Sequence, residues 1–370
     1  MNKKSKKCKI IQKDNLRNKQ FQKDINVISK NQKSHKTKYD FAVGGQAVME
    51  GVMMRSAHFV TIAVRDPNGK IIIRDDQFTP FAKKLKMSKV PIVRGIIALF
   101  ESLYIGAKSL NFSSKVAMKE KISEKGFLSR KPFFAKISAD EQKNKKTKKQ
   151  KIEKYFYDFG MGLMIILSYI LAIGLGLFLF KYIPLLIADL SQKYFTIIAD
   201  NYILFNTIDG LVKIFIFLGY ILAISLFPDI KRVFEFHGAE HKSIMTYEHN
   251  LPLTPENATK QTRFHPRCGT SFIFFVLFLS IFIYTLIPQA DDFWIKLWQR
   301  IAILPLIAGV SYEILKLSAK YQHHFLIKLF IKPGLFFQKF TTKEPDKKEL
   351  EVGLAALKRA LELEKDFKTL

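Results

Sequence analysis

The chain has 370 residues, 48% of them hydrophobic, and a formal net charge of +28 at pH 7. Its two cysteines are too few for a disulfide framework. A strong basic excess can indicate a nucleic-acid-binding protein. Here, however, the charge gathers in lysine-rich stretches without interleaved aromatic residues or paired arginines, which is typical of solvated arms. The composition therefore does not favour a nucleic-acid partner.

Two stretches carry most of this charge. Residues 1–38 hold 13 basic and 2 acidic side chains, and residues 115–154 hold 14 basic and 5 acidic ones. We interpret the first as a disordered basic tail and the second as a basic linker, both able to contact anionic lipids of a nearby bilayer. The tail has no apolar core of a signal peptide, so we expect the thiols of Cys8 and Cys268 to face a reducing cytoplasm.

Residues 39–114 are predicted to form a cytoplasmic unit of hairpin and helix. Two β-rich runs flank the turn sequence of residues 66–69, Asp-Pro-Asn-Gly, which predicts a β-hairpin. The glycine-rich segment before it, residues 43–56, indicates bulges or close backbone approach. In the helix predicted at 91–113, charged residues recur every seven positions, so this helix should lie on the membrane or pack on the hairpin.

Residues 155–320 are predicted to be the membrane domain. A span needs about 20 mostly apolar residues. Four runs approach this length, at residues 160–180, 210–227, 270–287 and 301–317. The last run is short and contains a proline, a glycine and Glu313, so a re-entrant helix and a buried amphipathic helix remain alternatives to a span.

The connecting segments alternate in charge. The connection at 229–269 carries six Lys or Arg residues, whereas those at 181–209 and 288–300 have no basic excess. This alternation predicts four spans with both termini in the cytoplasm. Residues 321–370 should form a cytoplasmic helical segment, in which Asp346 and Glu349 have the spacing of a capping box ahead of an amphipathic helix.

The cytoplasmic connection 229–269 concentrates potential metal ligands. A helix restarting near Asp229 would place His237 and His241 one turn apart on one face, where two imidazoles can bind one metal ion. His265 and Cys268 close the same connection. We therefore predict a divalent metal site, most consistent with zinc, formed by these residues. Three protein ligands would leave a position open for catalysis, and four would close a structural site.

Candidate catalytic groups accompany these ligands. The spacing of His237, Glu240 and His241 matches the H-x-x-E-H pattern of inverted zinc proteases, in which the glutamate activates water. Glu313, a carboxylate within an apolar run, could serve as a further ligand or catalytic group. Glu50 and Arg55 could contribute acid–base and substrate-binding groups, or form only an ion pair. The alternative for each histidine is a hydrogen-bonded polar residue, and for Cys268 a small buried side chain.

Several motifs occur together in one order. They are residues 44–56, residues 236–248, residues 263–272, residues 308–313, residues 333–338 and Glu344-Pro345. Together they resemble the YqhQ-type family of bacterial multi-pass membrane proteins, over roughly residues 41–365. That family is described as predicted metal-dependent enzymes, so the resemblance implies a bacterial cytoplasmic membrane protein but names no substrate.

The predicted fold is an α-helical multi-pass membrane protein with about four transmembrane helices, a small α+β N-terminal unit and a C-terminal amphipathic helix. The predicted function is a metal-dependent enzyme of hydrolase type at the cytoplasmic membrane face. A non-catalytic scaffold with a structural metal site, or a carrier of small solutes or ions that uses Glu313, are the alternatives.

Overall fold

The computed structural model describes residues 43–118, 167–321 and 324–369, apart from isolated positions within these ranges, together with Leu163. The basic tail 1–38 and nearly all of the linker 115–154 lie outside the described residues. The chain divides into two compact units. Unit 1 comprises Met1–Met118, Ala223–Phe275 and Ala308–Leu370, and unit 2 comprises Lys119–Leu222 and Val276–Ile307. The predicted cytoplasmic segments at the two ends of the chain thus share one unit with the histidine-bearing connection.

A four-stranded antiparallel sheet forms the centre of unit 1. Its strands are β1 (Gly44–Val48), β2 (Gly51–Arg55), β3 (Phe59–Arg65) and β4 (Ile71–Gln77), paired in sequence order. The predicted hairpin is confirmed as β3 and β4, whose turn places Gly69 at a φ of 84°. The glycine-rich segment forms the preceding hairpin, β1 and β2, whose turn holds Glu50 at a φ of 52°.

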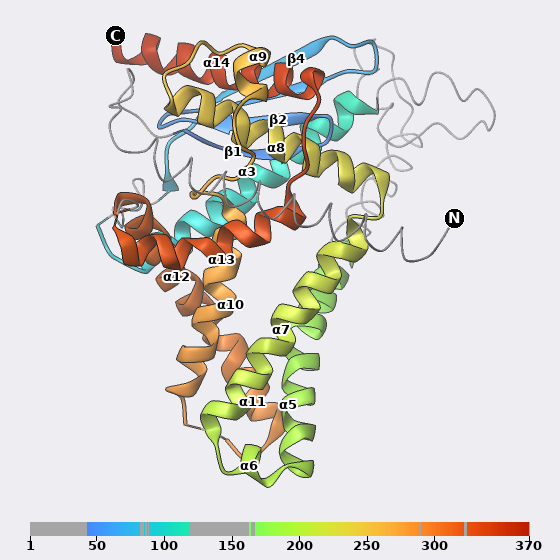
Figure 1. The fold of residues 1–370 in the computed structure, drawn as a ribbon, viewed down its shortest axis with the longest axis vertical. Coiled ribbons are helices and arrows are strands. Elements are labelled where there is room, and N and C mark those ends of the chain that lie inside the picture. The colour runs from blue at the N-terminus through green and yellow to red at the C-terminus, as the bar shows by residue number, and fades with distance from the viewer. Residues whose placement is uncertain are drawn as a thin grey trace, which may run out of the picture. The chain divides into compact units, whose positions relative to one another are not determined.

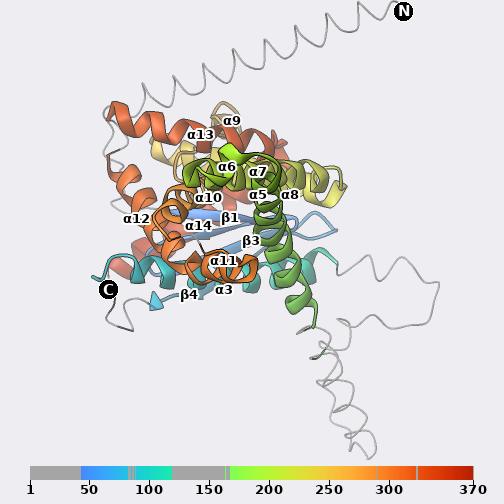
Figure 2. The same cartoon turned by 90° about the horizontal axis from the view of Figure 1, so that it is seen from below.

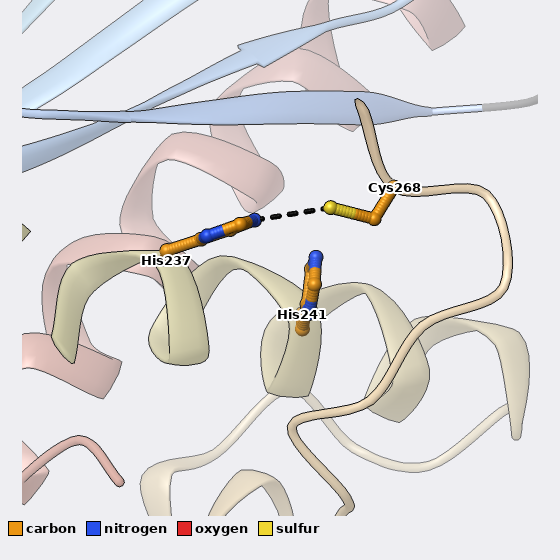
Figure 3. A group of neighbouring side chains, drawn as sticks. All are labelled: His237, His241 and Cys268. Atoms are coloured by element: carbon orange, nitrogen blue, oxygen red, sulfur yellow. Dashed lines mark hydrogen bonds between the residues drawn. The ribbon is translucent and has the colours of Figure 1, made fainter. Parts of the chain in front are cut away.

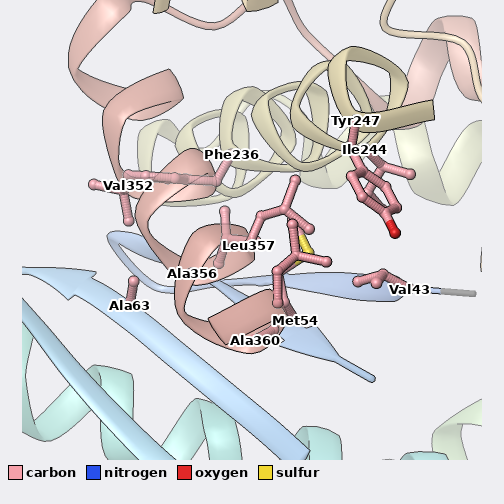
Figure 4. Packing of buried hydrophobic residues seen from close by; sticks show 12 residues of the cluster. Val43, Met54, Ala63, Phe236, Ile244, Tyr247, Val352, Ala356, Leu357 and Ala360 are labelled. Carbon is pink, nitrogen blue, oxygen red and sulfur yellow. The ribbon is translucent and has the colours of Figure 1, made fainter. Parts of the chain in front are cut away.

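Helices cover both faces of this sheet (Figure 1 and, in a second view, Figure 2). Helix α3 (Val93–Ala117) packs on one face through Ile105 and Val116. Helices α8 (Pro228–Glu248) and α14 (Lys347–Thr369) pack on the other face, where Phe236 and Leu357 join a core cluster (Figure 4). Strand β3 is apolar at nearly every position because both of its faces are buried.

The predicted capping box begins helix α14. The Glu349 backbone N–H donates to Asp346 Oδ1 at 2.7 Å, and the Asp346 N–H donates to Glu349 Oε2 at 2.8 Å. The leucine stripe of this helix is buried against the sheet and α8, with Leu350 and Leu357 fully enclosed. Two further elements of unit 1 lie near the candidate site, the short helix α9 (Pro255–Thr259) and helix α13 (Phe325–Thr341).

The charged stripe of α3 is confirmed, and its members bind residues of unit 1. Arg94 pairs with Glu313, and Glu101 accepts from Arg55 at 2.5 Å. Lys108 lies 3.2 Å from Asp76 of β4. Of the two predicted placements, on the membrane or on the hairpin, the structure shows the second. Helix α3 packs on the sheet, and these ion pairs hold its polar side against neighbouring segments.

The apolar helices lie mostly in unit 2. The first is a continuous helix, Leu167–Tyr194, that includes the π-helical turn η1 (Phe178–Tyr182) and α5 (Ile183–Tyr194). The other elements are α6 (Thr196–Ala199), α7 (Tyr202–Ile224), α10 (Gly269–Thr285), α11 (Phe293–Ala302) and α12 (Leu304–Lys320). Helices α10 and α12 each continue into unit 1.

The prediction of four spans is not matched by the described residues. Two helices, Leu167–Tyr194 and Tyr202–Ile224, are long and apolar enough to cross a membrane, and α11 with α12 would make a third if that pair, bent by 41°, is one span. Helix α10 has only 17 residues, fewer than the about 20 that a straight span needs. The first helix was predicted to stop before Lys181, but this lysine is 7% exposed and the helix continues past it.

Candidate metal centre

Helix α8 places His237 and His241 on the same face, as their spacing predicts. Their ring centroids lie 4.5 Å apart, and both rings point toward Cys268 (Figure 3). His241 is 1% exposed, so this part of α8 is deeply buried although its sequence is polar. The helix accommodates these side chains because the sheet, α14 and the segments around α13 cover it on several sides.

Backbone carbonyls orient both imidazoles. The Nδ1–H of His237 donates to the Thr341 carbonyl at 2.9 Å, and the Nδ1–H of His241 donates to the Arg263 carbonyl at 2.5 Å. A carbonyl oxygen can only accept, so each ring must carry its proton on Nδ1. The lone pair of each Nε2 is then available on the side of Cys268. Protein zinc ligands are commonly held in this way.

Cys268 supplies the third group from the N-terminal end of α10. Its Sγ lies 3.2 Å from His237 Nε2 and accepts from the Thr270 backbone N–H at 3.4 Å. Burial, the largest influence, raises the pKa of the thiol, but the combined influence of His241 and Thr270 outweighs it, so the net pKa lies below the ordinary value. Position at a helix N-terminus favours the thiolate for the same electrostatic reason.

The three donor atoms converge on one point. The ligand atoms of His237, His241 and Cys268 all lie within 4.8 Å of one another. Tetrahedral zinc holds nitrogen and sulfur ligands about 3.3 to 3.8 Å apart, so small side-chain shifts would bring this group into position. His241 Nε2 is buried and has no hydrogen-bond partner, which is a costly arrangement unless a further group binds there. Burial also lowers the pKa of His241, which favours the neutral, ligating form. The residues therefore fit a zinc ion with three protein ligands.

His265 lies beside this group with both ring nitrogens engaged. Its Nε2 is 3.4 Å from each carboxylate oxygen of Glu248, and its Nδ1 accepts from the Arg267 backbone N–H at 3.3 Å. Its ring centroid is 5.7 Å from that of His241. Burial lowers the pKa of His265. In this arrangement His265 lies beside the group of three donors and is not one of them.

Glu240 is buried between α8 and strand β1. Its side chain is 5% exposed and lies against Gly45, whose backbone N–H binds it. Burial raises the pKa of Glu240, against the opposing influence of His237, His265 and the Gly45 N–H. This carboxyl is therefore within electrostatic reach of the histidines without belonging to the three-donor group.

The other predicted site residues lie in separate ion pairs of unit 1. Glu50 pairs with Arg232 of α8, and Arg55 contacts Glu101 and the ring of Phe78. Glu313 pairs with Arg94. These three residues are thus not brought together with the histidines.

Gln338 of α13 is a site residue that sequence reasoning missed. It accepts from the His265 backbone N–H at 2.8 Å and donates to the His265 carbonyl at 2.7 Å, so one buried amide holds the segment that carries Cys268. Its only sequence signal is its place as the polar residue that ends the motif 333–338. The carbonyls of Arg263 and Thr341 carry no signal in the sequence, because every residue has a carbonyl.

Comparison with known proteins assigns the chain to a family. Residues 90–363 match the family described as a protein of unknown function, DUF1385. The chain belongs to the DUF1385 family. An uncharacterised protein of Bacillus subtilis (strain 168), YqhQ, is 35% identical over 323 residues, which cover 87% of this chain and 93% of that protein. No solved structure matches. The resemblance seen in the sequence motifs is thus confirmed, and the DUF1385 match includes His237, His241 and Cys268.

Proposed function

We propose that this DUF1385 protein is a metal-dependent enzyme of the hydrolase type whose metal, most consistent with zinc, is held by His237, His241 and Cys268. The observation that carries the proposal is the pair of Nδ1–H bonds to the Arg263 and Thr341 carbonyls, because they turn both Nε2 atoms toward one thiol. If the histidines were only structural, their buried ring nitrogens should all have hydrogen-bond partners, but Nε2 of His241 has none.

The arrangement of side chains suits hydrolysis. A zinc ion with three protein ligands polarises a substrate carbonyl or phosphoryl group and lowers the pKa of water. Cys268 would provide the thiolate ligand, stabilised by Thr270. Glu240 would accept and return a proton beside the metal ligands, and Gly45 would hold its carboxyl in place through the backbone N–H.

We place this enzyme in a bacterial cytoplasmic membrane, with the metal centre and both termini on the cytoplasmic side. The apolar helices Leu167–Tyr194 and Tyr202–Ile224 support membrane insertion. The orientation rests on the basic residues of the tail, of the linker and of the connection 229–269. The lysine-rich tail and linker would then lie near anionic lipids of the inner leaflet.

Metal analysis of the purified full chain in detergent tests the proposal. We expect about one zinc or similar ion per chain, and loss of most of it in the double variant His237→Ala/His241→Ala. The matched control is His249→Ala, because His249 ends the same helix and binds Gln261 at 2.7 Å outside the donor group. This control should retain the metal. Wild-type protein that stays metal-free after incubation with zinc would refute the proposal.

A second measurement separates an enzyme from a scaffold with a structural metal. Glu240→Gln should retain metal, because Glu240 is not one of the three donors, yet fail to complement a deletion strain at wild-type expression. Full complementation by Glu240→Gln, together with failure of His237→Ala, would replace the enzyme by the scaffold. A carrier that uses Glu313 is disfavoured by the ion pair between Glu313 and Arg94.

A further inference from the structure

Unit 2 contains a group of buried charged side chains that the proposed enzyme does not use. Its members lie on the apolar helices Leu167–Tyr194 and α7 and on α11. They are Lys181, Asp189, Asp209, Lys213, Lys296 and Arg300, and each is at most 9% exposed. Charged side chains within apolar helices are costly and usually mark a functional site.

Tyr284 is the centre of this group. Its ring lies under three cations, with the Lys213 Nζ and the Arg300 Cζ each 4.7 Å and the Lys181 Nζ 5.2 Å from its centroid. Lys181, placed by the π-helical turn η1, donates to the Tyr284 hydroxyl at 2.7 Å. Such π-helical turns are frequent at functional sites.

The carboxylates of the group cannot balance its cations. Asp209 pairs with Lys213 and Arg300, and Asp189 accepts from Lys296 at 2.9 Å. Four basic side chains therefore face two carboxylates, so two basic groups among the described buried residues have no buried carboxylate to balance them. A buried excess of this kind needs either lysines that have lost their protons or a bound anion.

A small cavity lies beside the cations. Its volume is about 10 Å³, and its lining includes Lys296, Arg300, Gln299 and the aromatic side chains of Tyr202 and Tyr284. This volume is close to the minimum for one water-sized occupant. Chloride, a single monovalent ion, needs less space than phosphate or sulfate, which carry four oxygens around a central atom. Lys296 and Arg300 in the lining favour an anion, so chloride is the occupant that suits a space of this size and charge best.

We propose that unit 2 binds a chloride ion in this cavity, beside Lys296 and Arg300, in a lining that also includes Tyr202 and Tyr284. The cavity walls come from the start of α7, the end of α10 and helix α11, so the bound ion would join these helices. The ion offsets part of the positive charge that Asp189 and Asp209 leave unbalanced. This site is independent of the metal centre in unit 1.

Chloride binding to the full chain in detergent tests the proposal through ³⁵Cl NMR line broadening, with sodium gluconate as the inert background salt. We expect broadening that bromide reverses and sulfate does not. Lys296→Met, which removes a cation from the cavity wall, should weaken chloride binding at least about tenfold. Lys193→Met is the matched control, because Lys193 lies 3.9 Å from the same Asp189 but its side chain is 65% exposed. The control should bind chloride within about twofold of wild type.

A second variant covers the case in which Lys296→Met fails to fold. Lys181→Met lowers the buried charge excess without changing the cavity lining, and it too should weaken chloride binding relative to Lys193→Met. Absence of chloride-specific broadening in the wild type would overturn the proposal and show that buried lysines are neutral instead. Equal weakening by Lys193→Met and Lys296→Met would also overturn it.

Discussion

Gly45 of strand β1 lies directly against the side chain of Glu240 on helix α8. A Cβ atom added at Gly45 would stand 2.8 Å from Glu240 Cγ and 2.7 Å from the Met53 carbonyl oxygen. The glycine-rich motif near the start of the chain and the histidine-bearing motif, almost 200 residues later, are therefore two sides of one contact. The absence of a side chain at Gly45 is what allows the sheet to cover a buried carboxyl.

The contact between Gly45 and Glu240 predicts that a side chain at position 45 destabilises the protein. Gly45→Ala should lower the stability of the protein by about 1 to 3 kcal/mol, because the strand or the Glu240 side chain must shift. It should also impair complementation of a deletion strain. Gly44→Ala is the matched control, since a Cβ there meets nothing within 4 Å. Thermal melts of the two variants in detergent provide the measurement, and equal melting temperatures would contradict the contact.

Glu240 itself carries a prediction about rate. Glu240→Gln keeps the size of the side chain and removes its ability to exchange a proton. We expect the metal content to stay near that of wild type while the cellular function falls by about 10²- to 10⁴-fold, as for loss of a general acid or base. Metal analysis and complementation at matched expression provide the two readouts. Loss of the metal in this variant would instead make Glu240 a ligand.

Gln338 is expected to affect the proposed metal centre without being one of its ligands. Gln338→Leu removes both hydrogen bonds to His265 and should cost about 2 to 3 kcal/mol, because the His265 backbone groups stay buried without partners. The segment with Cys268 would then be less well held, so zinc should dissociate faster in a chelator competition assay. A chelation rate equal to that of wild type would show that Gln338 does not position this segment.

The raised pKa of Glu349 predicts that the stability of the protein depends on pH. Burial is the main cause that raises its pKa to about 7 in the folded protein, against an ordinary value of 4.5. The folded state binds the proton more tightly than the unfolded state, so this contribution is fully present below pH 4.5 and is lost as the pH rises through about 7. The glutamine of Glu349→Gln has no proton to lose in this range. The stability of the variant relative to wild type should therefore rise by about 2 kcal/mol between pH 5 and pH 8. Parallel unfolding curves at the two pH values measure this difference, and a constant difference would refute it.

Membrane topology can be tested by cysteine labelling. In a background without Cys8, cysteines at Lys260 and at Asp291, both exposed positions, should differ in reaction with an impermeant thiol reagent in intact cells. The proposed orientation expects labelling at 291 and none at 260, because the basic connection 229–269 stays in the cytoplasm. Equal labelling at both positions would exclude this topology.

Local patterns in the sequence were sufficient for several elements. The Asp-Pro-Asn-Gly turn, the capping box at Asp346 and the i, i+4 spacing of His237 and His241 each depend on residues close together in the chain. Turn geometry, capping and helix periodicity are local interactions, so the sequence alone determines them. The predicted membrane spans were less accurate. The first helix continues through Lys181 because this lysine finds partners in Tyr284 and Asp209, which lie far along the chain.

The composition of the candidate site was decided by tertiary structure. Spacing proposed four ligands with Glu313 as a fifth, but only packing shows that Glu248 and Arg267 engage His265 and that Arg94 engages Glu313. By itself, the sequence determined which residue types could bind a metal and which helix face carries two of them. The fold decided which of their donor atoms are left without another partner, because that depends on carbonyls, glycines and charges brought in from distant segments.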